Sequence, residues 1–270
     1  MCCFSPVAAA PSFLARLFSK RPELSVSETS LFARMEGSGE QVLVYSMKLT
    51  VAGDVAMVLP LPVVTGLGDG ALTFVDLQAH AGFFADLEAL FAMMEPLAKG
   101  GSGLRQSRSQ PKLVVHEVGA FEASYVPTRR DFSRLDERFR IPDAVWDGLG
   151  RYDDFGFAVF RLAPGKKKHI HPMAFRFRTR DPSQLFFPTV HVHDGKVHPT
   201  ADFDHTLYYQ DTGLDPTGPR RDDVAGDPVS AMTAVKDFKG LVRAGEYVAK
   251  RTLHGDLPNV DTRVPLRASD

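Results

Sequence analysis

The 270-residue chain is 44% hydrophobic and 24% charged, the composition of a globular protein with one large domain or two small ones. Its 32 basic and 33 acidic residues leave a formal net charge of -1, without the positive excess that binding to nucleic acid or to an anionic membrane requires. The longest apolar stretch, residues 51–64, is interrupted by Gly53, Asp54, Pro60 and Pro62 and falls short of the roughly 18 apolar residues of a membrane span. We therefore expect no nucleic-acid partner and no transmembrane segment.

The amino-terminal segment, residues 1–23, contains both cysteines of the chain, Cys2 and Cys3. Adjacent cysteines can bridge only through a strained ring, so a disulfide framework is excluded. The segment also lacks the basic start of a secretory signal, and Pro6 and Pro11 interrupt its short apolar stretch. We therefore expect a reducing, cytoplasmic environment.

Removal of Met1 would leave Cys2 with both a thiol and a free amine, which permits several chemistries. Cys2 could be the catalytic nucleophile of a hydrolase or amidase, with its own amine as base. Alternatively, Cys2 and Cys3 could bind copper or zinc together with histidines. A third possibility is palmitoylation beside an amphipathic turn at residues 13–18, and a fourth is a frayed end without function.

From residue 24 onward we expect one domain, 24–270, that begins with three strands. The runs at residues 25–35, 40–50 and 54–63 are rich in β-branched and apolar residues and are separated by glycine-containing turns. A meander is the simplest topology for them. Further strands are predicted within residues 112–127, 155–162, 206–209 and 246–253, with an irregular end from His254 onward.

Helical spacing of apolar residues predicts the main helix at residues 76–94, with Asp76 able to cap its start. Amphipathic residues 129–140 predict another helix, and a short one follows Pro142 and includes Trp146, which we expect to be a core anchor. The Gly-, Ser- and Arg-rich residues 99–111 predict a loop. The fold class expected is α+β, mainly antiparallel β-sheet with a few packed helices.

Two His-x-His pairs are the most distinctive pattern of the chain. Residues 170–178 and 185–192 are Phe-rich runs separated by a turn signal around Pro182, which predicts a hairpin. Strand side chains alternate between faces, so each His-x-His pair shares one face. With one parity of the loop, His171 lies opposite His193 and the pairs form one patch; with the other parity they lie on opposite faces.

Imidazole pairs at alternate strand positions are suited to Zn or Cu ions, and Met173 on the same face would favour copper. The alternative is that these histidines are solvated side chains beside the basic residues 166–168. His198 and His205 could be further ligands or polar loop residues, and we favour the loop interpretation for both. The cofactor expected is therefore copper or zinc, with a predicted ligand set of Cys2, Cys3, His169, His171, His191 and His193.

The opening MCCFS, the runs QVLVYSMKL and VAMVLPLPV, and the later stretch HPMAFRFRTRDPSQLFFPTVHVHDGKVH resemble a family of uncharacterised bacterial proteins that begin with the same cysteine pair. Residues 8–23 look like an insertion relative to that pattern. More distantly, the order of elements is similar to a family of exported bacterial proteins of unknown function with cysteine-rich mature ends, although this chain lacks their export signal. The resemblance implies a single domain and no particular activity.

Taken together, the residues point first to a metal-binding protein, possible chemistries being oxidation at copper or hydrolysis at zinc. The first alternative is a hydrolase or amidase with Cys2 as its nucleophile. The second alternative is a non-enzymatic interaction module, because no convincing acid/base dyad stands out in the sequence.

Overall fold

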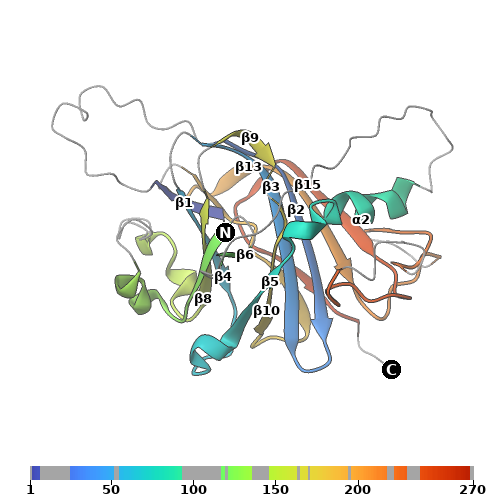
Figure 1. Ribbon diagram of the computed structural model, residues 1–270, viewed down its shortest axis with the longest axis horizontal. Coiled ribbons are helices and arrows are strands. Elements are labelled where there is room, and N and C mark those ends of the chain that lie inside the picture. Colours follow the sequence, from blue (N-terminus) through green and yellow to red (C-terminus); the bar gives the residue numbers. More distant parts are fainter. Residues whose placement is uncertain are drawn as a thin grey trace.

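A computed structural model of the protein describes residues 2–6, 25–51, 55–92, 117–118, 121–135, 146–162, 165–169, 171–193, 196–217, 222–229 and 238–267. Within these ranges the strands form two large sheets (Figure 1). The first sheet is 6-stranded with the order β12-β1-β4-β8-β7-β6. Its strands are β1 (Cys2–Pro6), β4 (Val55–Leu61), β6 (Glu117–Val118), β7 (Phe121–Val126), β8 (Gly156–Leu162) and β12 (His191–Val192).

The second sheet is 8-stranded, with the order β14-β15-β13-β2-β3-β10-β5 and with β9 paired to β3. Its strands are β2 (Ser25–Glu36), β3 (Glu40–Val51), β5 (Leu72–Asp76), β9 (Gly165–His169), β10 (Met173–Arg178), β13 (Thr200–Gln210), β14 (Asp223–Val224) and β15 (Ala249–Pro258). Two further strands, β11 (Gln184–Phe187) and β16 (Thr262–Pro265), pair only with each other. Most neighbours are antiparallel, and the parallel pairs described are β1–β12 and β13–β2.

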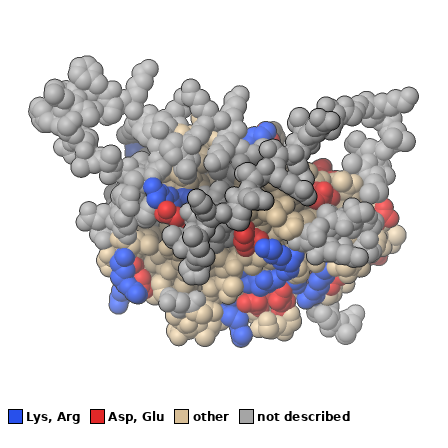
Figure 2. Space-filling model, in the orientation of Figure 1, with Lys and Arg blue, Asp and Glu red and all other residues tan. Residues whose placement is uncertain are grey.

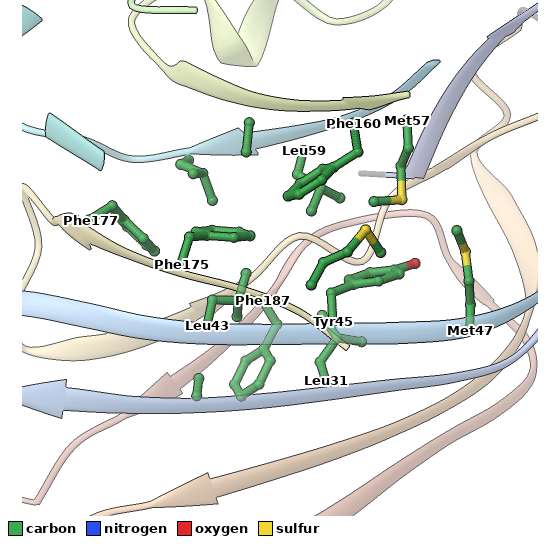
Figure 3. Close-up of a cluster of buried hydrophobic side chains, with 14 of the residues drawn as sticks. Leu31, Leu43, Tyr45, Met47, Met57, Leu59, Phe160, Phe175, Phe177 and Phe187 are labelled. Carbon is green, nitrogen blue, oxygen red and sulfur yellow. The ribbon is translucent and has the colours of Figure 1, made fainter. Parts of the chain in front are cut away.

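The main core lies between the two sheets. Met57, Leu59 and Phe160 of the first sheet face Leu43 and Tyr45 of the second (Figure 3). The sequence predicts that β3 and β4 are buried on both faces. Alternate residues of a strand face opposite sides of its sheet, so a nearly continuous apolar run such as β3 or β4 places apolar side chains on both sides.

The outer face of the second sheet is covered by α2 (Phe83–Ala92) (Figure 1). Phe83 and Leu87 of the helix pack in one buried cluster with Phe32 and Val44 of the sheet. A third cluster lies on the outer face of the first sheet and includes Trp146, which is buried as expected of a core anchor. Three apolar layers therefore enclose the two sheets.

The mainly antiparallel sheet of the predicted fold class is confirmed, and the described residues contain less helix than expected. Among the described residues the only α-helix with defined bounds is α2, and it begins seven residues later than predicted, since β5 and the 3-10 helix η2 (Gln78–His80) precede it. Asp76 does accept a hydrogen bond from the Gln78 N–H, at 2.8 Å, but at the start of η2. The predicted helix at 129–140 is the 3-10 helix η3 (Arg129–Arg134) as far as residues are described. The short 3-10 helices η1 (Gly68–Ala71) and η5 (Gly150–Tyr152) complete this set.

Two predicted pairings are wrong. β2 and β3 form the expected hairpin, closed by Gly39 at a φ of 74°, but β4 leaves that sheet and pairs with β1 and β8. The histidine hairpin does not form either, because β10 inserts between β3 and β5 while β11 pairs with β16. The predicted loop at 99–111 lies outside the described residues.

The surface presented in Figure 2 carries basic and acidic side chains interspersed, as the balanced composition suggests. None of the helices in the described ranges has the length and apolarity that crossing a bilayer requires.

Candidate functional site

Two histidines from different sheets meet at the β12 end of the first sheet. His191 lies on β12, whose parallel pairing with β1 places Cys2 opposite His191 and Cys3 opposite Val192. His205 lies on β13 of the second sheet, opposite Thr29 of β2. The Nε2 atoms of His191 and His205 are 3.1 Å apart. One neutral imidazole can therefore donate to the other, or both lone pairs can face a shared cation.

Aromatic rings surround this pair. The ring of His193 stacks on that of His191 with centroids 5.0 Å apart, and Phe203 lies 4.5 Å from His191 on another side. Burial, followed by the proximity of His205 and His193, lowers the pKa of His191 to about 3. Burial also lowers the pKa of His205, which is 2% exposed. Both imidazoles are neutral at pH 7, the form in which histidine binds metals.

Asp204 lies near the other ring nitrogen of His205. The Oδ1 atom of Asp204 lies 3.6 Å from Nδ1 of His205, and its Oδ2 accepts a hydrogen bond from the Glu28 N–H at 2.7 Å. Burial alone would raise the pKa of Asp204, but these interactions with His205 and Glu28 outweigh it and lower that pKa. At 3.6 Å this contact is electrostatic, and the buried Nδ1 of His205 has no hydrogen-bond partner within the described residues.

The backbone that presents Glu28 is strained. Glu28 has a φ of 51°, and the register between β2 and β3 shifts between Ser27 and Ser30, as at a β-bulge. Such local irregularity occurs preferentially at functional sites, where the surrounding structure offsets its cost. Here it directs one backbone N–H toward Asp204.

His191 is held in place by Asn259, a buried residue after β15. The Asn259 Oδ1 accepts a hydrogen bond from the His191 N–H at 2.7 Å, and its Nδ2 donates to the carbonyls of His191 at 2.9 Å and His198 at 3.0 Å. These bonds explain how the two-residue strand β12 keeps a defined position.

A cavity of about 350 Å³ opens beside the histidines and is lined by residues of β2, β12, β13 and their connections. Its lining includes His191, His193, Asp204 and Thr29. The Oγ1 atom of Thr29 is buried and has no hydrogen-bond partner within the described residues. A buried hydroxyl without a protein partner is costly, and water or another polar group in the cavity can satisfy it.

The six predicted ligands are only partly brought together. Cys2 is next to His191 by backbone register, and His193 stacks on His191. His171 packs instead on Phe121, with centroids 4.2 Å apart, and His169 lies opposite Lys48 on β9. Among the side chains that the structure describes, no three His, Cys, Asp or Glu residues form a group suited to a metal ion; the side chains of Cys2, Cys3 and His169 are not among them.

Sequence reasoning favoured a loop position for His205, because it predicted the strand only from Thr206 onward. The signal was the alternation in β13, where Phe203, His205 and Leu207 are buried and the residues between them are more exposed. Extending the strand toward its start by that alternation would have placed His205 on the buried face.

Comparison with known proteins gives a fold likeness. No family model and no curated protein sequence matches the chain. The crystal structure of baculovirus P35 matches with a TM-score of 0.50 and 12% identity, over 90% of this chain and 97% of that chain. P35 in the caspase-8/P35 complex matches with a TM-score of 0.44 and 11% identity, over 89% of this chain and 96% of that chain. A mutated baculovirus P35 after caspase cleavage matches with a TM-score of 0.47 and 12% identity, over 89% of this chain and 100% of that chain. The fold of this chain is therefore similar to that of baculovirus P35.

Proposed function

We propose that this protein is a non-enzymatic interaction module that binds a caspase-like peptidase. The observation that supports this proposal is the extent of the fold likeness to baculovirus P35, which covers 90% of this chain and 97% of P35. A match that includes nearly all of both chains relates whole proteins rather than a common substructure. Fold alone does not determine function, so the partner class is an inference by analogy.

The partner class comes from what the P35 structures contain. One holds P35 bound to caspase-8, and another holds P35 after caspase cleavage. Applied to this chain, the analogy predicts that a peptidase binds the protein and cuts it at a sequence that fits the peptidase's specificity pocket.

The sequence suggests a basic cleavage position. Residues 99–111 contain Arg105 and Arg108 among Gly, Ser and Gln, and they contain no Asp. An arginine fits a specificity pocket with an acidic base, whereas an aspartate fits a basic pocket. We therefore propose a partner that cleaves after arginine rather than after aspartate.

The experiment mixes the full chain with two peptidases, caspase-8 and a caspase-like enzyme that cleaves after arginine. Size-exclusion chromatography and intact mass then report complex formation and the cleaved bond. We expect a complex with the arginine-directed enzyme and one cut after Arg105 or Arg108. The double change Arg105→Ala and Arg108→Ala should abolish the cut, whereas Arg130→Ala, at an exposed position elsewhere, should not.

The outcomes separate the two parts of the proposal. A complex with caspase-8 alone would refute the arginine assignment and keep the peptidase partner. Failure to associate with either enzyme at micromolar concentrations, by a protein whose circular dichroism confirms folding, would refute the proposed function.

A further inference from the structure

We propose that an extended basic peptide of another protein adds as a short strand along the free edge of β13 at residues 200–204, inside the cavity beside His191. The peptide recognised carries lysine or arginine at alternate positions. This inference does not depend on peptidase binding, because it concerns the start of β13 rather than the cleavage positions proposed within residues 99–111.

The first part of β13 is paired on one side only. β13 lies between β15 and β2 in the second sheet (Figure 1). Its antiparallel pairing with β15 begins at Thr200, whereas its parallel pairing with β2 begins only at His205, opposite Thr29. Within the described residues, no strand pairing joins residues 200–204 of β13 to residues 25–28 of β2. The sheet is therefore open between these two strands at their starts.

The cavity of about 350 Å³ occupies this opening. Its lining includes Val26 of β2 and residues 200–202 of β13. The exposure of β2 changes at the same place, since residues 25–28 are exposed or half-buried whereas residues 31–34 are buried. The free edge of β13 thus faces an accessible cavity and not the packed core between the sheets.

A strand edge without a neighbour suits an extended peptide. Its unpaired backbone N–H and C=O groups form hydrogen bonds with an added strand, and the side chains around it determine which sequence is preferred. The cavity volume lies within the range of known ligand sites, about 300–1,000 Å³. Because the free edge covers only residues 200–204, the added strand is short.

The side chains of the cavity favour a basic peptide. Asp202 and Asp204 line the cavity, and none of the described residues that line it is lysine or arginine. Asp202 forms no ion pair or hydrogen bond within the described residues, and Asp204 uses one carboxylate oxygen for the Glu28 N–H. Alternate residues of a strand share one face, so basic residues at alternate positions of an added strand can lie opposite both carboxylates.

The test measures binding of synthetic, fluorescein-labelled peptides to the full chain by fluorescence anisotropy at pH 7.5 and low ionic strength. One peptide has lysine at every second position, with valine or threonine between, and its control has glutamate in place of lysine. We expect saturable binding of the lysine peptide and at least tenfold weaker binding of the glutamate peptide. Hydrogen exchange should show new protection of the amides at residues 200–204.

Backbone methylation tests strand addition separately from charge. An added strand bonds to one neighbour through alternate amides. Two versions of the lysine peptide, N-methylated on one or the other alternate set of amides, should therefore differ. We expect one version to lose binding and the other to retain it.

Variants of the protein test the charge complementarity. Asp202→Asn should weaken binding of the lysine peptide by roughly two- to fivefold, the size of one cross-strand ion pair. Asp202→Lys should reverse the preference toward the glutamate peptide. The matched control Asp227→Asn removes the same charge at an exposed position outside the cavity and should bind like the wild type.

Circular dichroism first confirms that each variant is folded. Absence of binding, equal binding of the lysine and glutamate peptides, equal binding of the two methylated versions, or an unchanged preference in Asp202→Lys would each overturn the proposal. No peptidase is present in these assays, so their outcome is independent of the proposed function.

Discussion

The imidazoles of His191 and His205 connect the two sheets of the protein, with Nε2 atoms 3.1 Å apart although the residues belong to different sheets. Each ring has its own support: Asn259 fixes the backbone of His191, and Asp204 lies at Nδ1 of His205. The contact is thus a supported feature of the fold, and its supports can be tested one at a time.

Asn259→Ala should destabilise the protein by about 2–4 kcal/mol, because it removes three hydrogen bonds and leaves buried backbone groups of His191 without partners. Denaturant unfolding at pH 7 measures this as a lower midpoint. Asn259→Asp retains the acceptor for the His191 N–H and should lose less. A loss of less than about 0.5 kcal/mol in the free energy of unfolding of Asn259→Ala, which is typical of a surface position, would show that these hydrogen bonds do not hold His191 in place.

Asp204→Ala should lower the free energy of unfolding by about 1 kcal/mol, because the Oδ2 of Asp204 accepts a hydrogen bond from the Glu28 N–H at 2.7 Å. Denaturant unfolding at pH 7 measures this loss as a lower midpoint. Asp204→Asn retains an acceptor oxygen and should lose less. An unchanged midpoint in Asp204→Ala would show that this hydrogen bond does not hold the irregular backbone at Glu28.

Phe160→Ala should cost about 3–5 kcal/mol, because its fully buried side chain fills the space between the sheets. Its ring lies 5.5 Å from that of Phe74 and 6.1 Å from that of Phe175. Phe160→Leu retains most of the volume and should cost less than half as much. Equal unfolding midpoints for the wild type and Phe160→Ala would show that the sheets do not pack through this residue.

The fold should lose stability at alkaline pH because of three buried tyrosines, Tyr152, Tyr208 and Tyr209. Burial, together with hydrogen bonds to Asp261, Glu88 and Asp222 respectively, raises the pKa of each phenol above its ordinary value of 10.0. The unfolded chain loses these protons near pH 10 while the folded chain keeps them, so stability falls as pH rises beyond 10. Absorbance at 295 nm should show these phenols ionising only as the protein unfolds. Full reversible ionisation of all 6 tyrosines near pH 10, with the fold intact, would contradict this.

The local sequence pattern predicted where strands begin and end better than it predicted which strands pair. β2, β3 and β8 lie within a residue or so of the expected bounds, because alternation and turn residues are local signals. The partners of β4, β10 and β11 are set by long-range packing between sheets, which short-range pattern does not encode. The chain after His254 was expected to be irregular, yet β15 continues to Pro258 and β16 follows. The sequence did not indicate this because β15 is only half-buried, so the alternation of apolar residues along it is weak.

The predicted metal ligands stay predictions. The sequence indicated that Cys2 and a His-x-His pair could act together, and the β1–β12 register places Cys2 beside His191. Sequence reasoning favoured a loop position for His205, because the predicted strand began only at Thr206. Asp204, Glu28 and Asn259 act through contacts between residues distant in sequence, which no motif records.

Titration of a peptidase with this protein tests the proposed peptidase binding most directly. A fixed concentration of an arginine-directed, caspase-like peptidase is mixed with increasing amounts of the full chain, and the fraction of enzyme in complex is measured by size-exclusion chromatography. We expect the amount of complex to rise with added protein until it saturates, with one cut after Arg105 or Arg108. Absence of a complex at a large excess of folded protein, for this enzyme and for caspase-8, would contradict the proposed function.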